Sequence, residues 1–402
     1  MQINPMPLDR ATSFILNRLT SLGYEANLVG GSVRNHLLGL PVTDVDITTS
    51  ATPDETKAAF FDCRVIETGI KHGTVTVLVD GTPCEITTYR SDGEYLDNRH
   101  PSSVEFTTSL RDDLSRRDFT VNAICYNPQD GYTDLFDGVG DIERRVIRAI
   151  GDPEVRFRED ALRILRALRF SSVLGFDIDP ATADAIHRTR HLLRNVSRER
   201  IYVEWDKLLG GSGAYGILTD YPDVIEIAIP ELSGLKLPTP EAFLAADTTV
   251  RALALFFLTT ADPVSCFDTA MRALHTDNFT RIGGSTALKI YPTLDPTTPE
   301  LVALAVYEYG ITPVTLAISL GICLGKFSPA VRASLDAVKS GMVISSLSSL
   351  AIDGADLVAR GIRGRAVGDL LDMIFRMVIS GELANERAPL IAYVDNTLGV
   401  SD

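Results

Sequence analysis

The pattern of hydrophobic and polar positions divides the chain into two regions. In the first third, short runs rich in β-branched and apolar residues predict strands, at residues 27–29, 45–48, 74–79, 84–89 and 121–126. A short helix is expected at 32–38. The turn-forming sequence Asp80-Gly81-Thr82-Pro83 predicts that two of the strands form a hairpin. From residue 153 onward apolar residues recur at helical spacing, which predicts an almost wholly helical remainder.

Glycine- and proline-rich stretches interrupt the helical pattern and predict boundaries near residues 150, 210 and 345. At 402 residues the chain is longer than the roughly 100–200 residues of one domain. The expected class is therefore α+β, a mixed sheet followed by helical parts, over residues 1–150, 151–210, 211–345 and 346–402. The composition, 45% hydrophobic and 23% charged, excludes a disordered or fibrous chain.

The sequence also gives predictions about cellular location, membrane spans, disulfides and zinc sites. No basic stretch followed by an apolar run stands at the N-terminus, so we expect a cytoplasmic protein. The longest apolar tract, 311–324, is shorter than the ~20 residues that cross a bilayer and is expected to be a core helix, with no membrane partner. The five cysteines include no C-x-x-C pair, which argues against thiolate zinc sites and disulfides.

The net charge of −15 excludes a generally basic nucleic-acid-binding protein, so an RNA partner would need a local basic patch. Five arginines gather between Arg188 and Arg200, with Glu199 as the one acidic residue among them. This clustering in an acidic chain favours phosphate contact; a solvated helix face is the alternative.

The strongest candidate for chemistry is Gly30-Gly31-Ser32-Val33-Arg34, followed ten residues later by Asp44-Val45-Asp46. Side chains two apart in a strand project from one face, so Asp44 and Asp46 are predicted to share two divalent cations, with Mg²⁺ the ion that oxygen ligands and phosphates suit. The glycine pair allows backbone N–H groups to approach a triphosphate, and a helix starting at Ser32 would direct its positive end at that anion. A surface strand end beside a tight turn is the alternative.

Glu85 is the candidate third carboxylate, because it belongs to a predicted hairpin strand expected near Asp44 and Asp46. Its alternative is a solvated strand residue, since sequence alone does not fix strand register.

The segment 116–123 combines charged and amide side chains just before a predicted strand. Arg117, Asp118 and Asn122 are predicted to recognise a ribose hydroxyl and a phosphate together. A charged turn that caps the next strand is the alternative.

Residues 159–169 are predicted to form one amphipathic helix, with Asp160 and Arg163 as neighbours at i,i+3 on its polar face. An acceptor beside a forked donor matches the hydrogen-bonding edge of cytosine or adenine. A simple helix salt bridge is the alternative. Ser197 is predicted to cap a further helix that supports this one.

The ordered set of motifs resembles the class II tRNA nucleotidyltransferases, the bacterial-type CCA-adding enzymes, whose relatives include bacterial poly(A) polymerases. The resemblance covers about residues 28–205. The matching segments are 30–34, 44–46, 116–123, 159–163 and 197–200. The runs 353–357 and 381–386 look like the end of the same family, whereas 211–345 carries no matching motif.

The resemblance implies a polymerase-β-type nucleotidyltransferase head followed by an all-helical neck, body and tail that hold tRNA. It implies that Asp44 and Asp46 bind metal, that Arg117, Asp118 and Asn122 serve ribose recognition, and that Asp160 and Arg163 select CTP or ATP. Arg166 would bind triphosphate.

Finer features of the resemblance concern the output of the enzyme. Residues 95–101 resemble the loop with which family members switch from C to A addition, and 69–74 resemble the CCA-adding rather than the polyadenylating branch. Asn35 departs from the Asp that is common in the family, and no His-Asp phosphohydrolase domain follows. The expected function is addition of C, C and A to the tRNA 3′ end. Addition of A alone or of a poly(A) tail, and non-catalytic RNA binding, are the alternatives; the sequence gives no oligomeric state.

Overall fold

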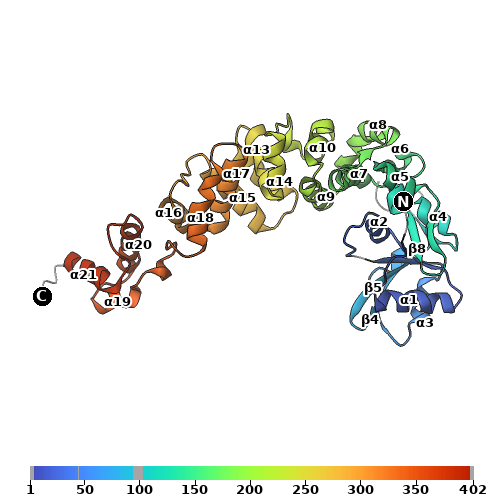
Figure 1. Cartoon of the computed structure of the whole chain (residues 1–402), viewed down its shortest axis with the longest axis horizontal. Helices are drawn as coiled ribbons and strands as arrows, with labels where there is room; N and C mark the ends of the chain where they lie inside the picture. Colours follow the sequence, from blue (N-terminus) through green and yellow to red (C-terminus); the bar gives the residue numbers. More distant parts are fainter. Residues whose placement is uncertain (1–3, 44, 94–102, 399–402) are drawn as a thin grey trace. The chain divides into compact units, whose positions relative to one another are not determined.

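The computed structural model describes residues 4–43, 45–93 and 103–398. The chain divides into two compact units, Met1–Pro230 and Glu231–Asp402 (Figure 1). The expected finer boundaries near 150, 210 and 345 stay predictions.

A seven-stranded sheet forms the centre of the first unit, in the order β3-β4-β5-β2-β1-β8-β9. β2 and β5 are parallel and the other neighbours are antiparallel, so the predicted mixed sheet is confirmed. The strands span Ala26–Val29 (β1), Asp46–Thr49 (β2), Arg64–Ile66 (β3), Thr74–Val79 (β4), Thr82–Thr88 (β5), Ile124–Asn127 (β8) and Gly131–Asp134 (β9). Two small two-stranded sheets pair Arg90–Asp92 (β6) with Val104–Phe106 (β7), and Val146–Ile147 (β10) with Asp177–Ile178 (β11).

The hairpin between β4 and β5 is confirmed, but its turn is shorter than predicted. Asp80 and Gly81 both have positive φ, 50° and 84°, and suffice to reverse the chain. Thr82 and Pro83 already pair with β4. The strand predicted at 121–126 is wrong in its first half, because a 3₁₀ turn at Thr120–Asn122 precedes β8.

Eleven α-helices accompany the described strands of this unit. They are Arg10–Ser21 (α1), Gly31–Leu37 (α2), Pro53–Ala59 (α3), Leu110–Ser115 (α4), Gly138–Arg144 (α5), Pro153–Glu159 (α6), Leu162–Leu174 (α7), Pro180–Thr189 (α8), Arg198–Gly210 (α9), Ala214–Asp220 (α10) and Pro222–Ala228 (α11). α7 packs chiefly against α9, and its buried side includes Ile164 and Leu168, both fully buried. This apolar seam fixes the polar side of α7 relative to the rest of the unit.

A buried apolar cluster joins the sheet to α4. It consists of Val29 at the end of β1, Leu114 in α4, Ala123 and Cys125 around β8, and Ile150. Val29 immediately precedes the glycine pair, and Leu114 lies just before the segment 116–123. This cluster therefore brings two of the sequence motifs together.

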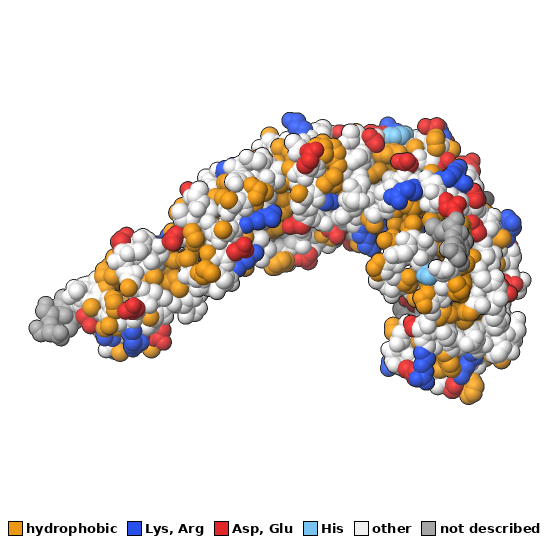
Figure 2. All heavy atoms as spheres, viewed as in Figure 1, with side chains coloured by type: hydrophobic (Ala, Val, Ile, Leu, Met, Phe, Trp, Pro, Cys, Tyr) orange, Lys and Arg blue, Asp and Glu red, His pale blue; other side chains and the backbone are white. Residues whose placement is uncertain are grey.

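The regular elements of the second unit are all helices in its described residues. Its α-helices are Pro240–Ala245 (α12), Thr248–Thr259 (α13), Pro263–Ala273 (α14), Asn278–Ile290 (α15), Pro299–Tyr309 (α16), Ile311–Cys323 (α17), Arg332–Lys339 (α18), Gly354–Ala359 (α19), Arg365–Ile379 (α20) and Arg387–Thr397 (α21). The apolar tract predicted to be a core helix is α17, which contacts α13 and α15. On the face drawn in Figure 2, acidic and basic side chains are interspersed over this unit rather than separated by sign.

None of the helices in the described part of the chain combines the length and the apolar character that crossing a bilayer requires.

Candidate nucleotide-binding site

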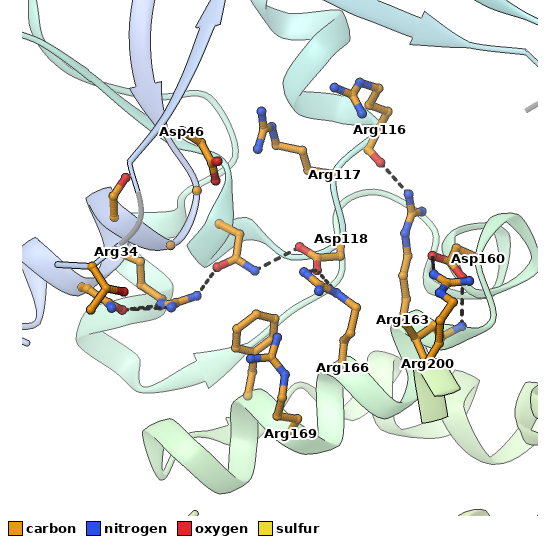
Figure 3. A pocket seen from close by; sticks show the side chains of 18 residues that line it. Arg34, Asp46, Arg116, Arg117, Asp118, Asp160, Arg163, Arg166, Arg169 and Arg200 are labelled. Carbon is orange, nitrogen blue, oxygen red and sulfur yellow. Dashed lines mark hydrogen bonds and ion pairs between the residues drawn. The ribbon is translucent and has the colours of Figure 1, made fainter. Parts of the chain in front are cut away.

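One cavity in the first unit collects most of the residues that the sequence singled out (Figure 3). It has a volume of about 660 Å³, and seven arginines but only three aspartates line it. The lining residues are Gly30, Gly31, Ser32, Arg34, Asn35, Thr43, Asp46, Arg116, Arg117, Asp118, Asn122, Asp160, Leu162, Arg163, Arg166, Arg169, Phe170 and Arg200. The excess of positive charge, in a chain whose net charge is −15, suits an anionic ligand.

Three parts of the predicted site are not among these lining residues. Asp44 and the loop at 95–101 lie outside the residues that the structure describes. Glu85 is described, but it is not among the residues that line the cavity.

The glycine elbow between β1 and α2 permits a close approach of backbone to charged side chains. Gly30 has a φ of +81°, a conformation that disfavours any side chain. A Cβ at this position would lie 3.6 Å from Asp46 Oδ2 and 3.8 Å from Arg117 Nη1. The hydroxyl of Ser32 donates to the carbonyl of Val29 at 3.2 Å, which ties the start of α2 to the end of β1.

Two carboxylates occupy paired positions on neighbouring strands. Asp46 at the start of β2 is the register partner of Glu85 in β5, and both are exposed. Paired residues of adjacent strands point to the same face, with Cβ atoms ~5 Å apart. Oxygen donors of this kind suit Mg²⁺. Within the described residues, which omit Asp44, no group of three or more His, Cys, Asp or Glu side chains forms a metal-binding cluster.

A buried hydrogen-bonded network connects α2 and α7, two of the helices that carry arginines of the site. Asp118 accepts from Asn122 Nδ2 at 3.0 Å and from Arg166 Nε at 2.8 Å. The other end of the Asn122 amide, Oδ1, accepts from Arg34 of α2. Burial raises the pKa of Asp118, but Arg166 and the Asn122 amide outweigh it, so the pKa lies well below the ordinary range. Asp118 is therefore a fixed negative charge at neutral pH.

Arg34 differs from its neighbours because the groups that bind its guanidinium are amides. Besides Asn122, it donates to Asn35 Oδ1 from Nε at 3.2 Å and from Nη2 at 2.9 Å. Burial, followed by the charge of Arg169, lowers the pKa of Arg34 to about 10. Arg34 therefore remains cationic at pH 7 while lacking a carboxylate bound to it in the described structure.

Asp113 is a site residue that the sequence reasoning missed. It is fully buried in α4 and accepts from Arg116 Nη2 at 2.7 Å and from Arg117 Nη2 at 3.3 Å. Its Oδ2 also accepts from Thr48 of β2 at 3.1 Å. One buried carboxylate thus links two cavity-lining arginines to the strand that carries Asp46. The available signal was its i,i+3 and i,i+4 spacing to the arginine pair.

The single helix predicted at 159–169 is wrong. α6 ends at Glu159, Asp160 has an extended backbone, and α7 begins at Leu162. Asp160 Oδ1 instead accepts from the backbone N–H of Leu162 at 3.1 Å, a local side-chain-to-backbone bond in the turn between the two helices. This turn interrupts a segment that the apolar periodicity predicts as one continuous helix.

Asp160 and Arg163 both line the cavity but do not pair with each other. Asp160 Oδ2 accepts from Arg200 Nη2 of α9 at 2.7 Å. Arg163 Nη1 donates to Glu159 at 2.6 Å, and its Nη2 donates to the carbonyl of Arg116 at 2.7 Å. Both side chains are thus held in place by neighbours from other elements, and the simple Asp160–Arg163 salt bridge is excluded.

The arginine-rich segment 188–200 is not a surface of unpaired cations. Arg188 pairs with Glu154 at 2.6 Å and Arg190 with Asp223 at 3.0 Å. Arg198 donates to the carbonyl of Ala228 at 2.6 Å. Part of the positive charge of this segment is therefore compensated by carboxylates within the fold, and its contact with phosphate stays a prediction.

The end of this segment does reach the site. Arg200 lines the cavity; the sequence placed it in the basic cluster but did not predict that it belongs to the nucleotide site. Ser197 stands at the predicted N-cap position of α9, but its side chain makes no capping hydrogen bond.

Some donors of cavity-lining side chains have no partner among the described residues. The Nε of Arg117 and the Nη1 of Arg200 are buried and make no hydrogen bond within the described structure. Buried N–H groups are nearly always satisfied in proteins, so these two donors indicate a ligand or water at this place.

Two family models match the chain. The model described as the poly A polymerase head domain matches residues 26–148, and the one described as the probable RNA and SrmB-binding site of polymerase A matches residues 175–219. The first contains the glycine elbow, Asp46, Glu85 and the segment 116–123.

Curated relatives align over nearly the whole chain. A protein of Lacticaseibacillus paracasei named CCA-adding enzyme is 38% identical over 384 residues, 94% of each chain. A protein of Streptococcus suis with the same name is 35% identical, over 99% of each chain. Among solved structures, the Bacillus stearothermophilus CCA-adding enzyme in complex with CTP is 31% identical, with a TM-score of 0.77 and coverage of 98% of this chain and 99% of that one. With this identity and coverage, and with a head-domain match over residues 26–148, the chain belongs to the family of CCA-adding enzymes.

Proposed function

We propose that this protein adds C, C and A to the 3′ end of tRNA without a nucleic-acid template, using CTP and ATP and releasing pyrophosphate. The observation that carries the proposal is the cavity in which cationic side chains lie together with Asp46, the acceptor Asp160 and the donor Arg163. The tRNA 3′ hydroxyl oxygen bonds to the α-phosphorus in line, the α–β phosphoanhydride bond breaks, and pyrophosphate leaves.

The arginines of the cavity bind the triphosphate in this proposal. Arg34 contributes a charge to which no carboxylate is bound, and Arg117 contributes a buried Nε without a partner in the described structure. Arg166 is held toward the cavity by Asp118. Such preplaced donors hold a polyanion and stabilise the charge that develops on the departing pyrophosphate.

The base is read by side chains rather than by a template strand. Asp160 offers acceptor oxygens and Arg163 offers a forked donor, matching the donor and acceptor edge of cytosine or adenine. The contacts with Arg200, Glu159 and the Arg116 carbonyl orient both groups before the nucleotide arrives. This preorganisation lowers the entropic cost of base recognition.

Ribose recognition is assigned to Arg117, Asp118 and Asn122. Asp118 and Asn122 already share a hydrogen bond, so a ribose hydroxyl would join an existing network rather than create one. The assignment favours ribonucleotides because a 2′-hydroxyl both donates and accepts.

Two Mg²⁺ ions belong to the proposal, with Asp44 and Asp46 as ligands and Glu85 beside Asp46 on the neighbouring strand. When bound, such ions activate the attacking hydroxyl and stabilise the leaving pyrophosphate. The exposure of Asp46 on the cavity wall and its register with Glu85 support this assignment.

The test uses tRNA transcripts that end before the CCA sequence. The purified protein is supplied with CTP, with ATP and with both, and the 3′ ends are sequenced. We expect two C residues with CTP alone and a complete CCA with both nucleotides. Failure to incorporate CTP rejects CCA addition, and long A tails identify a poly(A) polymerase instead.

A matched pair of variants separates chemistry from RNA binding. Asp46→Ala should abolish incorporation while tRNA binding in a filter assay persists. Asp54→Ala removes an exposed aspartate of α3 whose partner is Lys57, at 2.9 Å, and should leave incorporation unchanged. Retained turnover in Asp46→Ala would reject the metal assignment, and loss of turnover in all preparations would favour a non-catalytic RNA-binding protein.

A further inference from the structure

Three cationic side chains surround one aromatic ring in the cavity. The guanidinium carbons of Arg34, Arg166 and Arg169 lie 5.0, 5.3 and 3.8 Å from the ring centroid of Phe170. Phe170 lies on α7, lines the cavity and is 5% exposed. Figure 3 shows the three labelled arginines reaching the same region, Arg34 from α2 and the other two from α7.

This arrangement is unusual within the molecule. Every other cation–ring contact among the described residues brings one cation to a ring, as Arg145 does at Phe176. Like charges at such short range repel one another, and part of that repulsion shows in Arg34, whose pKa burial lowers first and Arg169 lowers further. A compensating attraction is therefore required.

Carboxylates compensate two of the three arginines. Arg166 pairs with Asp118 at 2.6 Å and Arg169 with Glu204 at 2.5 Å. In the described structure, Arg34 instead donates to the amide oxygens of Asn35 and Asn122. The π faces of an aromatic ring carry negative electrostatic potential and attract cations most strongly when water is excluded. The Phe170 ring is the element that all three arginines share.

We propose that Phe170 is a positioning residue of the triphosphate site, whose ring holds Arg34, Arg166 and Arg169 together before the nucleotide binds. The ring itself does not contact the reacting atoms. Its contribution is to keep three cations at the spacing at which a polyphosphate meets all of them at once, so that binding requires little rearrangement. The inference rests on the proposed function, in that a nucleoside triphosphate enters this cavity.

The orientation of the ring is itself fixed by packing. Phe119 meets Phe170 edge to face, with centroids 5.8 Å apart and planes at 81°. Phe119 is fully buried and directly follows Asp118, the partner of Arg166. The same short segment therefore sets both the ring and the carboxylate that position the arginines.

The experiment compares three substitutions at one position. Phe170→Leu keeps an apolar side chain but removes the ring. Phe170→Met also removes the ring but has a more flexible side chain, and it serves if the leucine variant does not fold. Phe170→Tyr keeps the π faces. The measurements are kcat and KM for CTP with truncated tRNA, and the inhibition constant of inorganic tripolyphosphate, which probes anion binding without a base or ribose.

We expect the leucine and methionine variants to raise the KM for CTP and the inhibition constant of tripolyphosphate about tenfold, with kcat little changed, since the lost interaction acts in binding. The tyrosine variant should restore most of the affinity. A purely structural role would instead lower the amount of active protein without moving the inhibition constant.

The matched control is Phe176→Leu. Phe176 is 3% exposed and carries Arg145 at 5.0 Å, but it does not line the cavity. The Phe176→Leu variant should lose thermal stability, while its KM for CTP and its inhibition constant for tripolyphosphate stay unchanged. Equal shifts in the Phe170→Leu and Phe176→Leu variants, or a tyrosine variant as weak as the leucine one, would overturn the inference. The proposed function fails separately, if the unmodified protein and Phe176→Leu incorporate no nucleotide.

Discussion

Replacing Asp118 by asparagine removes the charge at the centre of the cavity's hydrogen-bonded network while keeping its shape. Asp118 is 8% exposed and holds Arg166 through contacts of 2.6 and 2.8 Å. An amide retains one acceptor, but its NH₂ group must face a donor, either Arg166 or Asn122. The variant therefore loses an ion pair and places two donors in contact.

The expected loss in the free energy of unfolding follows from how deeply Asp118 and Arg166 are buried. Breaking a fully buried ion pair costs about 3–5 kcal/mol. Here Arg166 is 34% exposed and keeps Glu204 at 3.8 Å, so water and a second carboxylate offset part of the loss. We expect Asp118→Asn to lower the free energy of unfolding by about 2 kcal/mol, which corresponds to a Tm lower by ~4–8 °C for a unit of this size.

The stability that Asp118 contributes should depend on pH in a defined direction, which gives a second measurement. The pKa of Asp118 in the folded protein lies below the unfolded value of ~3.9, because Arg166 and Asn122 stabilise the carboxylate more than burial destabilises it. The stability that it contributes is therefore fully present above ~pH 4 and is lost as the pH falls through the folded pKa. The Tm difference between wild type and variant should stay constant from about pH 8 to 5 and narrow below about pH 4.

Differential scanning calorimetry across this pH range tests the reasoning. Asp54→Asn, at an exposed position of α3, is the control and should show almost no change in Tm. A Tm for Asp118→Asn within 1 °C of wild type, or a difference that widens below ~pH 4, would refute the account of Asp118 as a stabilising charge.

Further predictions concern other groups around the cavity. Arg163→Ala should blur discrimination between CTP and ATP and admit UTP or GTP, measured by sequencing tRNA ends after incubation with each nucleotide; unchanged selectivity would argue against base reading by this side chain. Glu85→Gln should raise the Mg²⁺ concentration for half-maximal activity ~10-fold if Glu85 supports a metal ligand, and an unchanged Mg²⁺ titration would leave it a solvated strand residue. Asp113→Asn should raise the KM for CTP through displacement of Arg116 and Arg117, whereas a change confined to Tm would make its role structural.

Much of the fold was predictable from local patterns. β-branched runs and turn residues predicted β1, β2 and the β4–β5 hairpin close to their observed ends, because strand propensity and positive-φ turns act within a few residues. The helical character of the remainder followed in the same way from its periodicity. The helix boundary at Asp160 was missed because the bond from the Leu162 N–H to the Asp160 carboxylate is a local side-chain-to-backbone contact, which apolar periodicity does not contain.

The sequence by itself determined which residue types are available for the chemistry, because Gly30, Asp46, Asp118 and Arg163 belong to short motifs whose spacing expresses local geometry. Only the tertiary structure decided the partners, such as Arg200 at Asp160 and the cations around Phe170. These contacts join elements up to about 130 residues apart, and they depend on strand register and on how α7 packs against α9. Neither is encoded in a local pattern, since each is fixed by the burial of apolar surface from both partners at once.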